Sequence, residues 1–286
     1  MPQSAVRSVC KLALFVATTS AGALVVMSVA PAAFAVAHGR RPATAPSSAV
    51  SPSPSPSPSP SPSPSATPTA VSFKGTRAVG ALFTIKKGQL RHFCTAAVVQ
   101  SRHADLAITA AHCMQGRTLG RNSRVTFAPG YHDGKFPFGR WIVRSEYVDR
   151  NWRLHQDPND DVAFLLIGQP GRQIQKHTGG EKLETNVPLP QTVRVIGYPD
   201  SAELPITCSG PARRLHMTGY RQMVFDCGGY TDGTSGSPFL IPATKTTPTE
   251  VIGVIGGYQQ GGATSSVSYS SLFIGNVAAL FKRANS

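Results

Sequence analysis

Seven consecutive Ser-Pro pairs run from Ser51 to Pro64 and divide the chain into parts that cannot share one fold. Every second residue of this tract lacks a backbone N–H and has a fixed φ, so neither helix nor sheet can form there. We predict a disordered Ser/Pro-rich linker or pro-segment over residues 36–75, extended and semi-rigid. Its role is that of a stalk, of a segment that is later removed, or of a neutral tether. The folded domain is therefore expected in residues 76–286.

The part before this tract has the features of a signal peptide. Arg7 and Lys11 precede an apolar stretch that runs from Leu12 to about Ala37, and Ala33-Phe34-Ala35 has the small-x-small form of a cleavage site. We predict that residues 1–35 are a signal peptide and that the protein is secreted. The apolar stretch is also long enough to cross a bilayer, so an uncleaved membrane anchor is the alternative.

The cysteine count fits export. Cys10 lies in the predicted signal peptide, which leaves an even set of four in the rest of the chain. Four cysteines in an exported protein indicate two disulfides, for which three connectivities exist. A zinc site is disfavoured because the chain has no Cys-x-x-Cys pair. We predict no metal and no cofactor. The four cysteines are Cys94, Cys113, Cys208 and Cys227.

Lysine and arginine number 28 against 14 aspartates and glutamates, which gives a net charge of +14. Such a balance favours contact with nucleic acid, anionic cell-wall polymers or acidic membranes. The two tryptophans and seven tyrosines are not interleaved with basic residues, so we predict no nucleic-acid partner. We expect an exported monomer with a basic surface, which could bind anionic wall polymers electrostatically.

The folded part has the pattern of an all-β domain. Short runs rich in Val, Ile, Phe and Thr alternate with Gly, Pro, Asn and Asp, which indicates a sandwich or a barrel. Near the C-terminus, apolar residues at i, i+3 and i+4 predict a short helix over Asn276–Arg283. The predicted strands are Val79–Ile85, Phe93–Val99, Ala107–Ala111, Arg124–Phe127, Trp141–Val148, Val162–Ile167, Val193–Tyr198 and Val251–Ile255.

A serine motif, Thr231–Pro238, provides the first candidate for catalysis. A serine hydroxyl attacks a carbonyl only when a base takes its proton and donors hold the oxyanion. Gly233 allows a turn in which its own N–H and that of Ser235 point at one developing charge. The motif is not the nucleophile elbow of the α/β-hydrolases, because Ser237 stands where that elbow has glycine. A polar turn without catalytic function is the alternative.

Two further motifs provide a base and a carboxylate. His112 ends the motif Thr109–Cys113, and Asp161 opens an apolar run that continues to Ile167. A carboxylate on the second ring nitrogen of a histidine fixes its tautomer and stabilises the imidazolium. We prefer Asp161 to Asp160, which we expect on the solvent side. The remaining histidines of the domain are interpreted as surface residues: His92, His103, His132, His155, His177 and His216.

The three motifs, in the order His112, Asp161, Ser235, resemble the active-site blocks of the chymotrypsin-like (trypsin-like) serine peptidases. They are most similar to the secreted bacterial branch that includes the glutamyl endopeptidases, over about Val79–Arg283. The resemblance implies an all-β fold of two antiparallel six-stranded barrels, with the active site between them and a short C-terminal helix. It also implies a disulfide Cys94–Cys113, which leaves Cys208 to pair with Cys227.

The resemblance implies a secreted serine endopeptidase that cleaves protein or peptide substrates through a His112-Asp161-Ser235 triad and an acyl-enzyme. The oxyanion hole would be formed by Gly233 and Ser235. Two alternatives remain: a non-catalytic domain of this fold, and a cell-wall-attached binding protein.

Substrate preference is suggested by departures from the family. Trypsin-like members hold an aspartate six residues before the serine, where this chain has Gly229, and glutamyl members hold a histidine where it has Ile255. Neither basic nor acidic residues are therefore favoured before the cleaved bond, and we expect an apolar or small one. The remaining candidates for the pocket wall and edge are Tyr230, Asp232, Gly256 and Gly257.

Activation is expected to differ from that of the digestive members. They carry an aspartate immediately before the serine, which pairs with a newly cut N-terminus, and this chain has Thr234 there. Removal of the N-terminal segment at Arg77 is one hypothesis for processing.

Overall fold

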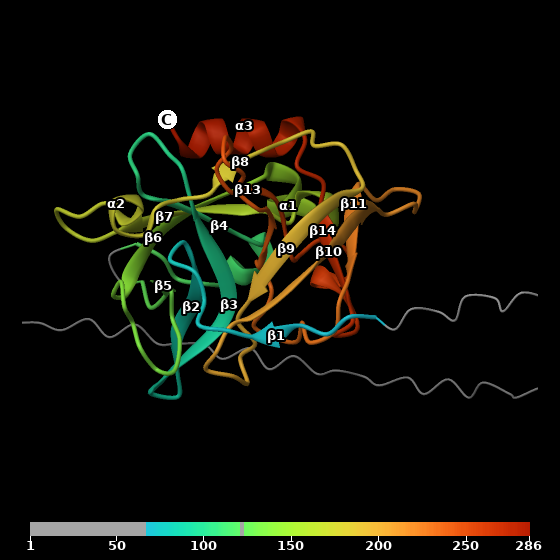
Figure 1. The fold of residues 1–286 in the computed structure, drawn as a ribbon. Helices are drawn as coiled ribbons and strands as arrows, with labels where there is room; N and C mark the ends of the chain where they lie inside the picture. Colours follow the sequence, from blue (N-terminus) through green and yellow to red (C-terminus); the bar gives the residue numbers. More distant parts are fainter. Residues whose placement is uncertain (1–66, 121–122) are drawn as a thin grey trace, which may run out of the picture. The chain divides into compact units, whose positions relative to one another are not determined.

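A computed structural model describes residues 67–120 and 123–286 (Figure 1). The predicted signal peptide and the Ser-Pro tract lie outside the described residues. Within the described ranges, none of the helices combines the length and apolar character that a membrane crossing requires.

The first sheet is a closed barrel of six antiparallel strands, as predicted. Around the barrel they run β2 (Val79–Lys86), β3 (Gln89–Val99), β4 (Leu106–Thr109), β7 (Ala163–Gly168), β6 (Trp141–Val148) and β5 (Thr126–Pro129).

Strands β2 and β3 are buried on both faces over residues 79–83 and 94–99, which explains why the sequence shows apolar runs there, whereas their hairpin ends are exposed. Successive side chains of a strand point to opposite faces. Leu82 and Val98 pack inside the barrel, whereas Ala81 and Val99 belong to a second cluster on its outer face. These strands therefore serve two cores at once.

The second sheet contains the six strands expected of the second barrel and two short additional ones. The path runs β14 (Val267–Ser271), β11 (Gln222–Asp226), β10 (Ile206–Arg214), β9 (Gln191–Gly197), β12 (Pro238–Ile241), β13 (Glu250–Val254) and β8 (Lys182–Leu183), with β1 (Val71–Ser72) paired to β10.

This second sheet is open rather than closed by a strand ladder. The ends β13 and β14 meet through isolated bonds, in which Gly256 N–H donates to Tyr269 O at 3.0 Å and Val254 N–H donates to Ser270 Oγ at 2.9 Å. A two-barrel architecture is thus present, with the second barrel completed by side-chain and loop contacts.

A shared apolar core fixes the two barrels against each other. It joins residues of the first barrel, such as Phe164, to Tyr198 and Leu240 of the second. The C-terminal helix α3 (Gly275–Ala284) covers this core with Val277 and Leu280, which confirms the predicted helix and its buried face. The other helices are η1 (Ala111–Met114), α1 (Arg150–His155), η2 (Pro158–Asp160), α2 (Ile174–Thr178) and η3 (Tyr258–Gly261).

The chain before the first barrel is hydrogen bonded to the second sheet. Ala70 N–H donates to Gly228 O at 2.8 Å, Gly228 N–H donates to Pro68 O at 2.7 Å, and Phe73 N–H donates to Pro205 O at 3.0 Å. The Phe73 side chain packs on the shared core. Residues 68–73 thus belong to the folded domain, although they lie on the linker side of the predicted boundary at residue 76.

A chain that begins at Ala78 should therefore be less stable than one that begins at Thr67. Loss of these hydrogen bonds and of the Phe73 contacts should lower the free energy of unfolding by about 3 kcal/mol. Urea denaturation of the two forms and of the full chain measures the difference, and the Thr67 form should match the full chain. We also expect N-terminal sequencing of the active species to find residues 68–73 retained. Equal stability of both truncated forms would restore Arg77 as a processing point.

Candidate active site

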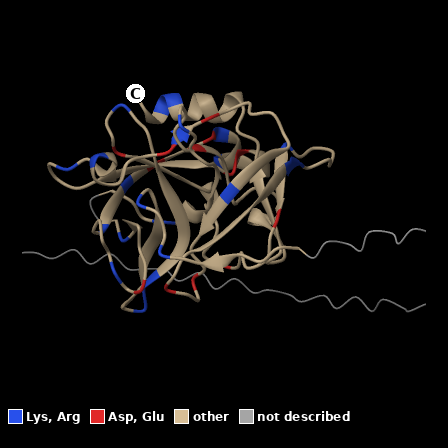
Figure 2. Ribbon diagram, in the orientation of Figure 1, with Lys and Arg blue, Asp and Glu red and all other residues tan. Residues whose placement is uncertain are grey.

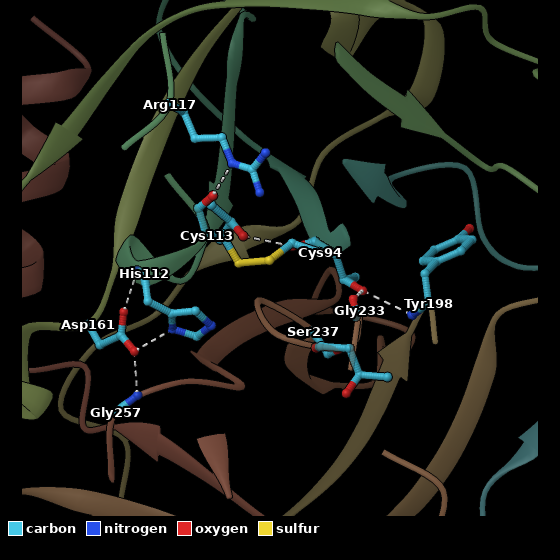
Figure 3. The surroundings of a disulfide bond; sticks show 12 residues. Cys94, His112, Cys113, Arg117, Asp161, Tyr198, Gly233, Ser237 and Gly257 are labelled. Atoms are coloured by element: carbon cyan, nitrogen blue, oxygen red, sulfur yellow. Dashed lines mark hydrogen bonds and ion pairs between the residues drawn. A yellow bond between two sulfur atoms is a disulfide. The ribbon is translucent and has the colours of Figure 1, made fainter. Parts of the chain in front are cut away.

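His112 lies on a short 3₁₀ turn that a disulfide anchors. Strand β4 ends at Thr109, Ala110 remains extended (φ −76°, ψ 145°), and η1 begins at Ala111. The disulfide from Cys113 to Cys94 of β3 confirms the pairing expected from the resemblance. One ring nitrogen of His112 lies within 4.8 Å of both sulfur atoms (Figure 3). The histidine is thereby held at the end of the first barrel, with 10% of its side chain exposed.

Asp161 accepts three hydrogen bonds in a fully buried position. His112 Nδ1 lies 2.8 Å from Asp161 Oδ2, and the His112 backbone N–H donates to Oδ1 at 2.9 Å. Gly257 N–H donates to Oδ2 at 2.7 Å (Figure 3). The Asp161 carboxylate beside Nδ1 keeps the ring proton of His112 on that nitrogen. The outer nitrogen of His112 is then free to accept a proton.

The backbone at Gly256 passes so close to this carboxylate that a side chain there would require its neighbours to move. A Cβ on Gly256 would lie 3.0 Å from Asp161 Oδ2 and 3.1 Å from Ala110 Cβ. The Gly256-Gly257 pair therefore orients Asp161.

Ser235 lies on a loop that is tied to the first barrel beside His112. Ser235 O accepts from Thr95 N–H at 2.8 Å, and Thr95 follows Cys94 of the disulfide. The next residue, Gly236, has φ +83°, and a Cβ there would lie 2.2 Å from both Thr109 Oγ1 and Thr95 O. Glycine after the serine thus permits the close approach of the two barrels. The structure places His112 in contact with Asp161, and it bonds the Ser235 loop to Thr95, which follows Cys94 of the His112 disulfide.

Two backbone N–H groups of the serine loop have no acceptor in the described ranges 67–120 and 123–286. Thr234 N–H donates to Thr231 O at 3.1 Å and Gly236 N–H donates to Ile255 O at 2.7 Å. The N–H of Ser235, which lies between these two residues, donates to no group of the described residues. The same holds for the N–H of Gly233, which precedes Thr234. Gly233 has φ +89°, where a Cβ would lie 2.4 Å from Asp200 N, so glycine is needed there as well.

Thr95 is a residue of this site that the sequence motifs did not reveal. Its hydroxyl donates to Gly233 O at 3.1 Å and accepts from Tyr198 N–H at 2.9 Å, and the residue is fully buried. A single hydroxyl of the first barrel thus holds the Gly233 peptide of the second. Its only sequence signal is its position immediately after Cys94.

A pocket of about 550 Å³ opens beside Ser235. The predicted wall residues Tyr230, Asp232 and Ile255 line it, whereas Gly229, Gly256 and Gly257 do not. Gly229 instead lies against the N-terminal segment, where a Cβ would be 3.5 Å from Ala70 Cβ. The buried lining residues among those described are uncharged: Tyr230, Thr234, Ile255, Gly261 and Ser268.

The predicted pocket edge at Gly256 and Gly257 has its backbone donors occupied. Gly256 N–H donates to Tyr269 O, Gly257 N–H to Asp161, and Tyr258 N–H to Gln222 Oε1 at 3.2 Å. Among the carbonyl groups of this edge, Gly257 O already accepts from Gln260 N–H at 2.9 Å.

Two expectations about neighbouring residues were wrong. Asp160 does not face solvent: it is 2% exposed and accepts hydrogen bonds from Asn276 of α3 and from Asn151, at 3.3 Å for the latter. Burial raises the pKa of the Asp160 carboxyl and these two donors oppose that shift. His92 is not a surface residue either, because it packs on Phe83 with 7% of its surface exposed.

The second predicted disulfide is also present. Cys208 of β10 is bonded to Cys227, which directly follows β11. This bond ties together the strands that lead to the loop of Ser235.

Comparisons with known proteins agree with this geometry. The trypsin-like peptidase domain family model matches residues 94–254. No curated protein sequence matches the chain. Among solved structures, the protease Anisep from Arthrobacter nicotinovorans is 21% identical with a TM-score of 0.62, over 75% of this chain and 98% of that one.

Two further structures are similar in fold. A thermostable serine protease, AL20, from an extremophilic microorganism is 23% identical with a TM-score of 0.62, over 73% of this chain and 97% of its own. A Glu endopeptidase is 16% identical with a TM-score of 0.57, over 77% and 98%. Because the family model covers more than half of the chain, the protein belongs to the trypsin-like peptidase family and is a serine endopeptidase of the chymotrypsin-like fold.

Proposed function

We propose that the protein cleaves peptide bonds through a catalytic triad of His112, Asp161 and Ser235, with an acyl-enzyme on Ser235. The observation that carries this proposal is the fully buried Asp161 carboxylate on Nδ1 of His112, with the Ser235 loop bonded to the same end of the barrel. A binding-only domain has no need of this set of contacts.

The reaction begins with proton transfer. Nε2 of His112 takes the proton of Ser235 Oγ as this oxygen forms a bond to the peptide carbonyl carbon. His112 then gives that proton to the leaving nitrogen as the C–N bond breaks, and the amine product leaves an ester on Ser235. Water attacks the ester by the same proton transfers, which releases the acid and restores the serine. Asp161 stabilises the imidazolium in both halves of the reaction.

The negative charge on the substrate oxygen would be held by Gly233 and Ser235. Their N–H groups lack acceptors among the described residues and lie on a loop fixed by Thr95. Pre-oriented donors of this kind contribute about 3 kcal/mol each to transition-state stabilisation.

Thr95→Val should weaken this oxyanion hole without changing the triad. Valine has nearly the shape of threonine but leaves Gly233 O and Tyr198 N–H unbonded in the core. We expect kcat to fall about 30-fold and the free energy of unfolding to fall by about 2 kcal/mol. Steady-state kinetics and urea denaturation measure the two effects.

Thr95→Ser is the matched control, because it keeps the hydroxyl and removes only a methyl group. It should retain kcat within about threefold. A valine variant with wild-type kcat would remove Thr95 from the oxyanion argument.

We propose an apolar or small residue before the cleaved bond. The uncharged inner wall at Tyr230 and Ile255 supports this assignment. Digestion of an unbiased peptide library would test it, and a dominant preference for Lys, Arg or Glu would contradict it.

We also propose that the enzyme acts outside the cell. Its two disulfides support this location, because such bonds persist in oxidising compartments. Its net charge of +14 supports electrostatic retention by anionic wall polymers, which high salt should release.

A fluorophosphonate probe tests the proposed function directly. The probe reacts with an activated serine, so the wild-type protein should be labelled and Ser235→Ala should not. Absence of labelling in folded, disulfide-bonded protein would reject the triad mechanism, and labelling of Ser235→Ala would assign the nucleophile to another residue.

A further inference from the structure

A second pocket, of about 590 Å³, has four basic side chains among its ten lining residues. Lys86 and Lys87 form the turn between β2 and β3, where Figure 2 shows basic residues, and Arg91 follows on β3. Arg117 comes from the chain after η1. The one acidic lining residue is Asp200, which is exposed. Four cations therefore face one carboxylate.

This cationic pocket adjoins the active site. Asp200 lines both this pocket and the pocket beside Ser235. Phe93, another lining residue, precedes Cys94, and the disulfide of Cys94 lies against the ring of His112. Figure 3 shows Arg117 above the disulfide, with His112 beside it.

The chemistry of the reaction determines which part of the substrate lies in each pocket. The residue before the cleaved bond places its side chain in the pocket beside Ser235, whose buried wall is uncharged, because its carbonyl carbon is bonded to Ser235. The leaving nitrogen must face His112 to receive a proton. The substrate chain after the bond therefore leaves past the Cys94–Cys113 disulfide and Phe93, towards the cationic pocket.

Arg117 is held in place before any substrate binds. Its Nε donates to Cys113 O at 3.2 Å, and its guanidinium carbon lies 3.6 Å from the centre of the Phe93 ring. A β-bulge sets this arrangement, since Leu82 pairs with Cys94 and Phe83 with His92, which leaves Phe93 as the extra residue. Burial lowers the pKa of Arg117, which is half-buried.

The four cations lack partners of opposite charge. In the part of the chain that the structure describes, none of Lys86, Lys87, Arg91 and Arg117 forms an ion pair. Arg91 donates to the neutral amide of Gln89. A carboxylate that enters the pocket would therefore find pre-placed donors, and Arg117 is the most strongly fixed of them.

We propose that this cationic pocket binds an aspartate or glutamate side chain of the substrate, within the first three residues after the cleaved bond. The enzyme then prefers peptides that are acidic on the leaving-group side. This inference rests on the proposed function, because it needs a peptide chain to cross from Ser235 past His112.

Matched quenched-fluorescence peptides test the proposal with the full-length protein. The peptides share the residues before the bond, taken from the library digest, and carry Glu, Gln or Lys in the positions after it. At low salt, kcat/KM should be about tenfold higher for the Glu than for the Gln peptide, and lowest for the Lys peptide. The Glu advantage should shrink in 0.5 M NaCl, where the Debye length falls from about 8 Å at physiological ionic strength to about 4 Å.

Two variants and one control locate the effect. Arg117→Gln and the exposed pair Lys86→Gln/Lys87→Gln should each bring the Glu/Gln ratio towards one. Arg140→Gln is the control: Arg140 also lies over an aromatic ring, 5.5 Å from the Phe136 centre, but does not line the pocket. It should keep the wild-type ratio.

The fluorophosphonate probe carries no residue after the bond, so it separates the two proposals. Labelling together with a Glu/Gln ratio near one in the wild type would overturn the cationic pocket alone. A ratio that survives in both variants would overturn its assignment to these residues. No labelling and no cleavage of any peptide would overturn both proposals.

Discussion

Ser235→Ala and His112→Ala should each lower kcat by about 10⁶-fold, and the double variant should lose no more than either. The serine without the base is not deprotonated, and the base without the serine has no nucleophile to activate. The two residues therefore act as a unit, so their effects do not add. Single-turnover cleavage of a quenched peptide by the three variants measures the comparison.

His177→Ala is a suitable control for this experiment. His177 is half-buried against Trp141, at 5.6 Å between ring centres, and lies outside the site. Its kcat should stay near that of the wild type. If the losses of the two single variants multiplied in the double variant, Ser235 and His112 would be acting independently and the proposed proton transfer would be wrong.

The catalytic candidates could be identified in the sequence because each lies in a short local motif of characteristic residue types. Each of Ser235, His112 and Asp161 sits in a few residues whose types restrict the local backbone, such as the glycine on either side of Thr234-Ser235. The contacts between motifs are different. Thr95 reaches Gly233 across 138 positions of the chain, and nothing in its own neighbourhood marks it as part of the site.

The two wrong expectations have packing causes. Asp160 was expected in solvent because the apolar run begins after Asp161, but Asn276 of α3 covers it from 116 residues away. His92 is turned inward by the β-bulge at Phe93, which reverses the alternation of β3. Neither a β-bulge nor burial by a residue distant in sequence can be predicted from the apolar pattern of a single strand.

The first barrel was easier to predict than the second for a similar reason. Its strands β4 and β7 are almost wholly buried and read as apolar runs. The predicted strand Trp141–Val148 matches β6 at both ends, although Arg144, Ser145 and Glu146 interrupt its apolar residues. Strand β10, Ile206–Arg214, alternates buried and solvent-facing residues and contains Pro211, so it gives no such run. It nevertheless forms a strand by pairing with β9 and β11, which its own sequence does not predict.

Asp161→Asn should lower kcat/KM by about 10⁴-fold at neutral pH. Oδ2 of Asp161 accepts from both His112 Nδ1 and Gly257 N–H, while Oδ1 accepts from the His112 backbone. Asparagine has one acceptor oxygen and one NH₂ group, so one of these donors must face another donor. With the NH₂ towards the ring, Nδ1 becomes the acceptor and the proton moves to Nε2, which can then no longer take the proton of Ser235.

Asp160→Asn is the matched control for this prediction, because it alters an adjacent carboxylate that is buried almost as deeply. Asp160 accepts from Asn276 and Asn151 and does not contact His112, so its variant should lose stability but keep kcat/KM within about tenfold. Kinetics from pH 6 to 9 measure the activity of both variants, and urea denaturation measures their stability. Together they distinguish a changed His112 tautomer from a loss of folded protein. Only the Asp161→Asn variant should remain folded and yet lose its peptidase activity. Equal losses of activity in the two variants, in step with their losses of stability, would mean that Asp161 supports the fold and does not orient His112.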